Sequence, residues 1–395
     1  MKLLRRAASP AAASALVSVL GLGVLFTSVA AAVGVRIASV ARRVVTPAPR
    51  VADVEVLAVD RGAQTITLSR TPDTQLPGRY GVFTNGAGYV KLGAVLSQDA
   101  SSVTRKLLSH IDAGTRLGPH ASFSGWYFDE PDQLHLPFTH EIVETPVGPS
   151  PAWLFPSGRG DVWAILVHGR GTTRAETLRA VPPLHAAGVS ALVVSYRNDG
   201  EAPASRSGLY GLGATEWRDI DAAMTWARER GAERIVLMGW SMGGAIVLQT
   251  AVNSPGRDAI VGLMLDSPVV DWRIVLDYHA RELGVPDFAA RAAMGTLSKP
   301  WTARAAGAGR GVRFDDLDMV ARAGELTVPI LILHSDDDGF VPSDASHALA
   351  RARPDLVTME TFTVARHTKL WNYDEGRWTG AIRAWLTARG LNAQA

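Results

Sequence analysis

The segment Ile235-Val236-Leu237-Met238-Gly239-Trp240-Ser241-Met242-Gly243-Gly244 decides the expected fold of this 395-residue chain. Its first four residues are apolar, which is typical of a short strand buried on both faces of a parallel sheet. The residues from Ala245 to Val252 predict an apolar helix. Between the two, the Gly-x-Ser-x-Gly pattern predicts a sharp turn that projects the hydroxyl of Ser241. The same turn aims the backbone N–H of Met242 at an oxyanion formed there, so the first hypothesis is a nucleophilic serine.

The composition limits the classes of function. With 47% hydrophobic and 20% charged residues, the chain can form one large globular domain and a smaller module. A net charge of +2 gives no signal for a nucleic-acid partner. The absence of cysteine excludes disulfides, thiolate metal sites and a cysteine nucleophile.

Residues 1–45 predict a membrane segment. The stretch from Ala7 to Val35 is uncharged and mostly apolar, with basic residues on both sides. It is long enough to cross a bilayer as a helix of about 20 residues, and its length favours a retained single-pass anchor. The alternative is a secretory signal peptide that is cleaved near Ala30-Ala31-Ala32 and leaves a secreted protein. The prolines of Thr46-Pro47-Ala48-Pro49 then predict a linker.

Short β-type runs follow the linker and predict a small β-rich module over about residues 50–120. They are Val54–Val59, Thr65–Leu68, Tyr80–Phe83 and Tyr89–Leu96. No catalytic constellation stands out among them. The expected role of this module is therefore packing or contact with a partner.

Alternating strands and helices predict an α/β domain over residues 121–395. Glu141–Glu144 and Ala152–Phe155 are expected to be antiparallel edge strands. The remaining strands are expected at Val162–Val167, Val189–Ser195, Ile235–Met238, Ile260–Leu265, Ile330–Leu333 and Val357–Phe362. Helices such as Thr215–Arg230 would cover a mostly parallel sheet, and sites in such sheets lie at the carboxyl ends of the strands.

The interval from Asp266 to Thr327 interrupts this alternation. Helical patterns occur there at Trp272–Leu283, Asp287–Met294 and Phe314–Ala323. An insertion at this place would overhang the carboxyl end of the sheet, so we expect a helical cap over about residues 268–326 that shapes substrate access. Its apolar residues suit either an acyl substrate or ordinary helix packing; they include Trp272, Val275, Leu276 and Phe288.

The acid and base that a serine nucleophile requires follow the last two predicted strands. The segment from His334 to Pro342, which reads His-Ser-Asp-Asp-Asp-Gly-Phe-Val-Pro, comes directly after the first of them. His367 follows the second. The chain thus supplies a serine, an acid and a histidine in that order.

These features resemble the α/β-hydrolase superfamily from about Glu141 to the C-terminus, including its Bem46-like and peptidase-like branches. The family's acid loop, HGxxDxxVP, matches the segment after the strand ending at Leu333 and implies that Asp338 is the acid. The segment departs from the family at Ser335, which replaces a glycine. Asp266 is the alternative, because some relatives place the acid there. The resemblance implies His367 as the base, preceded here by Arg366 instead of a small residue.

The oxyanion hole requires a second N–H donor beside that of Met242. Val162–Val167 runs into His168-Gly169-Arg170-Gly171, which resembles the family's HGxG loop. The resemblance implies that the backbone N–H of Arg170 is this donor and that His168 orders the loop. The later Tyr196-Arg197-Asn198-Asp199 run either faces the substrate or satisfies its own loop.

The sequence therefore predicts a serine hydrolase that acts on a small-molecule acyl substrate through an acyl-enzyme on Ser241. The expected bond is an ester or a thioester, as in carboxylesterases and lipases, and the reaction needs neither a metal nor an organic cofactor. A serine peptidase is the nearest alternative, because peptidases share the fold and the triad. A catalytically silent, membrane-bound binding protein is the other.

Membrane fractionation combined with mass spectrometry of the N-terminus tests the predicted anchor. We expect a membrane-bound chain that retains Ala7 to Val35, because about 20 apolar residues insert stably into a bilayer. A soluble chain that begins near Val33 would contradict the anchor and support signal cleavage.

Overall fold

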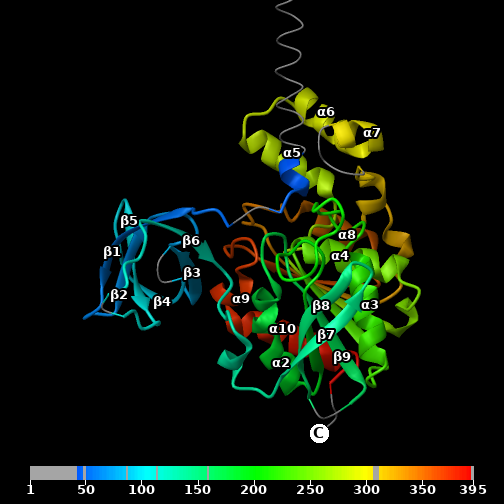
Figure 1. Cartoon of the computed structure of the whole chain (residues 1–395), viewed down its shortest axis with the longest axis horizontal. Coiled ribbons are helices and arrows are strands. Elements are labelled where there is room, and N and C mark those ends of the chain that lie inside the picture. The colour runs from blue at the N-terminus through cyan, green and yellow to red at the C-terminus, as the bar shows by residue number, and fades with distance from the viewer. Residues whose placement is uncertain are drawn as a thin grey trace, which may run out of the picture.

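The computed structural model describes residues 42–47, 50–85, 88–112, 114–157, 160–305 and 311–392. Figure 1 shows a barrel of short strands beside a larger sheet covered by helices, with a small group of helices above the sheet. The predicted membrane segment lies almost entirely outside the described residues. Within the described ranges, no helix combines the length and the apolar character that crossing a bilayer demands.

Six antiparallel strands close into a barrel. They are β1 (Val54–Asp60), β2 (Thr65–Ser69), β3 (Tyr80–Thr84), β4 (Gly88–Gln98), β5 (Ser102–Leu107) and β6 (His120–Ser124). Their order is β1-β2-β5-β4-β3-β6, and β6 pairs with β1 to complete the ring. The predicted β-rich module is thus present, with two strands that the sequence analysis did not identify. Closure of these six described strands leaves none of them as an unpaired edge.

A buried arginine organises the connection between β2 and β3. Arg105 on β5 is fully buried, and burial lowers the pKa of its guanidinium to about 10, so the group remains cationic at neutral pH. The guanidinium donates hydrogen bonds of 2.7–3.1 Å to the carbonyl oxygens of Thr74, Leu76, Gly78 and Gly93. The first three of these residues lie in the β2–β3 connection, whose course Arg105 therefore fixes.

The main sheet has eight strands in the order β14-β13-β12-β11-β9-β10-β8-β7. They are β7 (Thr139–Thr145), β8 (Gly148–Phe155), β9 (Val162–Val167), β10 (Ser190–Val194), β11 (Arg234–Trp240), β12 (Ile260–Asp266), β13 (Ile330–Ser335) and β14 (Val357–Phe362). Strands β9 to β14 pair in parallel, whereas β8 pairs antiparallel with both β7 and β10. The predicted parallel sheet with antiparallel edge strands is confirmed.

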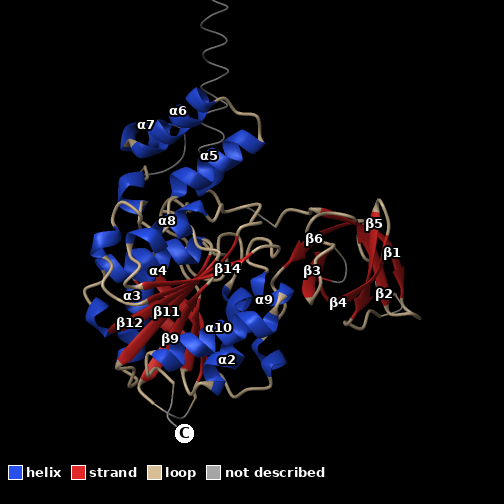
Figure 2. Cartoon of the chain, turned by 180° about the vertical axis from the view of Figure 1, so that it is seen from behind, coloured by secondary structure: helices blue, strands red, loops and turns tan. Residues whose placement is uncertain are grey.

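Helices cover both faces of this sheet, as Figure 2 shows. One face carries α3 (Trp217–Arg228), α4 (Met242–Asn253) and α8 (Asp344–Ala352), and the other carries α2 (Val181–Ala186), α9 (Leu370–Tyr373) and α10 (Glu375–Ala388). Strand β9 is buried throughout, with Ile165 in the first apolar cluster and Leu166 in the second. Its side chains thus contribute to the core on both faces.

The interval between β12 and β13 forms the helical group above the sheet in Figure 1. It contains α5 (Trp272–Glu282), α6 (Asp287–Ser298) and α7 (Pro300–Ala305), followed by the 3-10 helices η4 (Phe314–Leu317) and η5 (Ala323–Glu325). Trp272 and Val275 are buried in the core, whereas Phe288 is exposed. Packing thus accounts for part of the apolar character of the interval.

The prediction of a single helix over Phe314–Ala323 is wrong. The backbone of Asp318 is extended, with φ of −85° and ψ of 92°, so the helical course stops after η4. The Asp318 carboxylate then accepts the backbone N–H groups of Val320 and Ala321. Aspartate side chains favour such turns over helix interiors, and this preference outweighed the apolar periodicity.

Replacing Arg105 with methionine tests its structural role. The substitution leaves several buried carbonyl oxygens without a donor, so we expect the free energy of unfolding to fall by roughly 2–4 kcal/mol. Urea denaturation of the full chain measures this change. Lys106→Met is the control, because Lys106 lies on the same strand and donates one exposed hydrogen bond to Ala63. Equal losses in the two variants would contradict the assigned role.

Candidate active site

The turn between β11 and α4 holds Ser241 in a strained backbone conformation. Ser241 has φ of 51° and ψ of −117°, which residues with a Cβ rarely adopt. A Cβ on Gly239 would lie 2.3 Å from the carbonyl oxygen of Gly243, and a Cβ on Gly243 would lie 2.2 Å from that of Val167. Glycine at both positions is therefore a steric requirement of the turn.

The side chains of Ser241, His367 and Asp338 form a continuous chain of hydrogen bonds. His367 Nε2 lies 3.0 Å from Ser241 Oγ, and His367 Nδ1 lies 2.7 Å from Asp338 Oδ2. Ser241 and Asp338 are buried, and 16% of the His367 side chain is exposed. The structure thus brings together three sequence-predicted residues from the ends of β11, β13 and β14. With Nδ1 donating to the carboxylate, Nε2 is free to accept the serine proton.

The carboxylate of Asp338 is fully engaged. Its Oδ1 accepts the backbone N–H groups of Phe340 and Val341 at 2.9 and 2.8 Å, and its Oδ2 lies 3.3 Å from His334 Nε2. Burial by itself would raise the pKa of this carboxyl, but His367 and His334 hold the pKa well below its ordinary range. Asp338 is therefore an anion at neutral pH and favours a proton on the facing nitrogen of His367.

Asp266, the alternative acid, is engaged elsewhere. Its Oδ2 accepts the indole N–H of Trp378 at 2.8 Å, and its Oδ1 accepts the hydroxyl of Ser267 at 3.0 Å. Burial raises the pKa of the Asp266 carboxyl. The Ser267 hydroxyl also accepts the backbone N–H of Thr368 at 3.1 Å. Asp266 is thus linked to the histidine loop through Ser267, whereas Asp338 makes the hydrogen bond to His367.

The loop after β9 lies against the serine turn. A Cβ on Gly169 would lie 3.3 Å from the Cβ of Ser241. Met242 is the first residue of α4, so its N–H has no acceptor within the helix. Gly169 and Ser241 therefore lie close together, and Arg170 and Met242 directly follow them in the chain. The Arg170 side chain points away to the N-terminal segment, where it donates to the carbonyl oxygens of Arg43 and Thr46 at 2.7 and 2.8 Å.

Two buried charged residues that the sequence analysis did not single out order this loop. Glu176 Oε2 accepts the N–H of Gly169 at 3.1 Å and the hydroxyl of Thr172 at 2.7 Å, and its carboxylate lies 3.6 Å from Arg179. Burial alone would raise the pKa of the Glu176 carboxyl. Arg179 and these hydrogen bonds outweigh burial and hold the pKa below its ordinary value. Opposite charges three residues apart, directly after the glycine-rich loop, were the available signal.

The loop after β10 makes its polar contacts within the protein. The ring of His168 stacks on Tyr196 with 4.2 Å between centroids, and its Nε2 lies 3.1 Å from Asp199. Arg197 forms a buried ion pair of 2.6 Å with Asp219. The sequence left open whether this loop faces the substrate or uses its polar groups within the protein. These contacts match the second interpretation.

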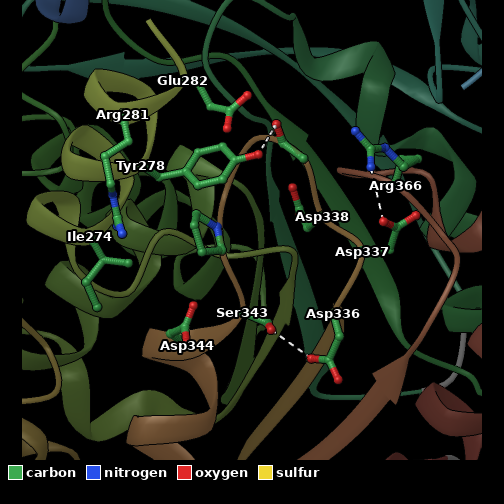
Figure 3. A pocket seen from close by; sticks show the side chains of 12 residues that line it. Ile274, Tyr278, Arg281, Glu282, Asp336, Asp337, Asp338, Ser343, Asp344 and Arg366 are labelled. Carbon is green, nitrogen blue, oxygen red and sulfur yellow. Dashed lines mark hydrogen bonds and ion pairs between the residues drawn. The ribbon is translucent and has the colours of Figure 1, made fainter. Parts of the chain in front are cut away.

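A cavity of about 470 Å³ lies between α5 and the loop after β13. Figure 3 shows Tyr278, Arg281 and Glu282 of α5 on one side and the acidic loop on the other. Asp338 belongs to the wall, whereas Ser241 and His367 do not, so the cavity lies beside the hydrogen-bonded chain rather than over the hydroxyl.

The ring of Phe340 contacts both the histidine and the cap. Its centroid lies 5.1 Å from that of His367 and 4.6 Å from that of His279 on α5. Phe340 is 46% exposed, and the buried Nε2 of His279 has no hydrogen-bond partner among the described residues. The exposed ring of Phe340 therefore lies between His367 and a cap histidine whose Nε2 has no partner among the described residues.

Comparisons with known families divide the chain at the same place as the fold. Residues 164–379 match the model described as the alpha/beta hydrolase family. Residues 55–124, which form the barrel, match a domain of unknown function (DUF8805). No protein with curated annotation matches the chain.

Solved structures share the fold of the larger domain. The esterase Pf2001 from Pyrococcus furiosus matches with a TM-score of 0.51 and 16% identity, over 66% of this chain and 95% of the esterase. A puromycin-hydrolyzing peptidase from Mycobacterium tuberculosis matches with a TM-score of 0.50 and 18% identity, over 84% of this chain and 47% of the peptidase. At such identities the likeness concerns the fold alone.

Labelling with a fluorophosphonate probe tests whether the three side chains act as a unit. We expect the parent chain to be labelled on Ser241 and Ser241→Ala to remain unlabelled. Asp338→Asn should slow labelling by about 10²- to 10⁴-fold, because the amide no longer fixes the reactive tautomer of His367. Asp336→Asn is the control, since Asp336 binds Ser343 and His347 instead. An Asp338→Asn variant labelled at the parent rate would contradict the arrangement.

Proposed function

This chain belongs to the alpha/beta hydrolase family, and we propose that it is a serine hydrolase that cleaves ester-type bonds in small acyl substrates. The observation that carries the proposal is the hydrogen-bonded chain from Ser241 through His367 to Asp338. A buried hydroxyl beside an imidazole whose other nitrogen faces a carboxylate is the arrangement that acyl transfer uses.

In this mechanism Ser241 Oγ attacks the acyl carbonyl carbon while His367 Nε2 accepts the hydroxyl proton. Asp338 stabilises the imidazolium through the Nδ1–H bond. The imidazolium then gives its proton to the leaving alcohol or thiol, and the acyl-enzyme remains on Ser241. A water molecule attacks this ester with His367 as the base, which releases the carboxylic acid and restores the serine.

The backbone N–H groups of Arg170 and Met242 are the proposed oxyanion donors. The proximity of Gly169 to Ser241 and the position of Met242 at the start of α4 support this assignment. Each such donor contributes about 2.7–4 kcal/mol to transition-state stabilisation. Because both donors are backbone groups, side-chain substitutions at these positions report on the substrate rather than on the hole.

A serine peptidase is the second candidate. The fold alone does not choose between ester and peptide bonds, because the esterase and the peptidase named above share it. The cavity wall specifically favours this alternative through Glu282 and Asp344, whose carboxylates could bind a substrate amine. The exposed ring of Phe340 instead suits an apolar acyl or leaving group. This ring lies 5.1 Å from that of His367, the proposed base, and so favours the esterase.

We further propose that the N-terminal segment anchors the hydrolase to a membrane. The apolar stretch of the sequence supports this proposal, together with the contacts of the residues that follow it. Val45 packs in the core, and the carbonyl oxygens of Arg43 and Thr46 bind the Arg170 side chain. The chain that follows such an anchor would therefore join the domain next to the loop after β9, which contains Arg170.

A panel of p-nitrophenyl esters of increasing chain length, compared with aminoacyl p-nitroanilides, tests the substrate class. We expect the parent chain to hydrolyse the esters with the higher kcat/KM. Ser241→Ala should lower this rate by about 10³-fold or more, since no other group supplies the nucleophile. Faster hydrolysis of the anilides would favour the peptidase. Ester hydrolysis retained in Ser241→Ala would refute the nucleophile, and inactivity of the parent on every substrate would favour a silent binding protein.

A further inference from the structure

The barrel contacts the loop that carries His367. Arg366 and Lys369, which flank this histidine, both bind Asp73 of the β2–β3 connection. We propose that Asp73 is a positioning residue: by holding Arg366 and Lys369, it fixes His367 in line with Ser241 and Asp338. This inference rests on the proposed role of His367 as general base, and it gives the barrel a part in that reaction.

The ion pairs are close and shielded from solvent. Asp73 Oδ2 lies 2.9 Å from Lys369 Nζ, and Asp73 Oδ1 lies 3.2 Å from Arg366 Nε. The side chains of Lys369, Asp73 and Arg366 are 11%, 23% and 24% exposed. A shared carboxylate in such a setting restricts two side chains at once, which isolated surface pairs do not achieve.

Asp73 is itself held rigidly. The hydroxyl of the fully buried Thr74 donates to the carbonyl oxygen of Ser69 at 3.0 Å and accepts the N–H of Thr71 at 2.8 Å. Arg105 binds the carbonyl oxygens of Thr74 and Leu76 from inside the barrel. The turn therefore presents the Asp73 carboxylate at a fixed place, as a supporting residue must be presented to orient another group.

The backbone on the barrel side also touches α9 and the histidine loop. A Cβ on Gly78 would lie 1.9 Å from the carbonyl oxygen of Asn372, and a Cβ on Gly125 would lie 2.5 Å from that of Thr368. Arg179 joins the two sides, because its Nη1 donates to the carbonyl oxygens of Gly125 and Thr368 at 2.9 and 2.8 Å. The ion pairs of Asp73 thus form part of a close-packed contact.

The histidine loop needs support that its own backbone does not supply. Thr368, directly after His367, has φ of 50°, a left-handed conformation that a β-branched residue disfavours. The preceding strand, β14, is the outermost strand on its side of the sheet. Figure 2 shows β6 and β3 of the barrel on the side of β14 and α9. The barrel therefore supplies support where the sheet has no further strand.

Arg366 extends the same contact to the acid loop. Its Nη1 lies 3.2 Å from Asp337 Oδ1, as the dashed line in Figure 3 marks, while its Nε binds Asp73. A Cβ on Gly339 would lie 1.9 Å from Arg366 Nη2, so the guanidinium lies directly against the acid loop. Asp73 thus constrains the relative position of the loops that carry His367 and Asp338.

Asp73→Asn tests the proposal, because asparagine keeps the shape of aspartate and removes its charge. The matched control is Glu375→Gln, which removes the exposed ion pair between Arg79 of the barrel and Glu375 of α10 and leaves both ion pairs of Asp73 in place. Hydrogen exchange of peptides covering residues 364–370 is measured first. We expect faster exchange in Asp73→Asn than in the parent or in Glu375→Gln, because the loop opens more often once the pairs are lost.

Steady-state kinetics on the best ester substrate provide the second measurement. We expect Asp73→Asn to lower kcat by about 10-fold with KM nearly unchanged, since a misplaced base slows the chemical step without weakening binding. Lys369→Gln should act in the same direction, and Asp73→Asn should add less in that background than in the parent. If Asp73→Asn does not fold, Lys369→Gln still tests the proposal, because it removes one of the two ion pairs of Asp73.

Each outcome separates this inference from the proposed function. Parent-like exchange and kcat in a folded Asp73→Asn would overturn it. Equal losses of kcat in Glu375→Gln would also overturn it, because they would indicate general loosening of the barrel contact. If the parent hydrolyses no substrate, the proposed function fails, yet the exchange data still show whether Asp73 orders the loop.

Discussion

The strained turn at Ser241 is the constraint on which the rest of the site depends. A left-handed φ of 51° at a serine is maintained only because β11 and α4 are fixed on either side of it and both flanking glycines lack a Cβ. The buried parallel sheet and the helix packing on it stabilise this conformation. The turn places the Ser241 hydroxyl at the carboxyl end of the sheet, next to the N-terminus of α4.

The histidine reaches this point under a different set of forces. Ser241 belongs to the middle of the sheet, whereas His367 follows β14 at its edge, where fewer backbone neighbours constrain a loop. In that loop, the N–H of Thr368 donates to the Ser267 hydroxyl, and the carbonyl oxygen of Thr368 accepts from Arg179. Asp73 holds the residues on both sides of the histidine from the barrel. The barrel and the larger domain therefore meet at the loop that carries His367.

The sheet and the three hydrogen-bonded side chains of Ser241, His367 and Asp338 could be predicted from the sequence, because they depend on local patterns. Buried strands such as Val162–Val167 are recognisable from their apolar runs, and the serine turn from its glycines. The residues that hold the site were not predicted. Arg179 and Asp73 act through partners distant in sequence, which no periodic pattern marks. Glu176 has local partners, and its charge three residues before Arg179 was the one signal available. The strand containing Arg105 was missed for a related reason, since its inward-facing arginine interrupts the apolar alternation.

We propose that Ser241 carries the acyl group during turnover. Rapid acid quench of the parent chain with a p-nitrophenyl ester, followed by intact-mass and peptide analysis, detects such an intermediate. We expect a burst of one p-nitrophenol per site and an acyl adduct on the peptide that contains Ser241, formed in the parent and lost in His367→Ala. An adduct on another residue, or rapid ester turnover with no burst and no trappable adduct on Ser241, would contradict it.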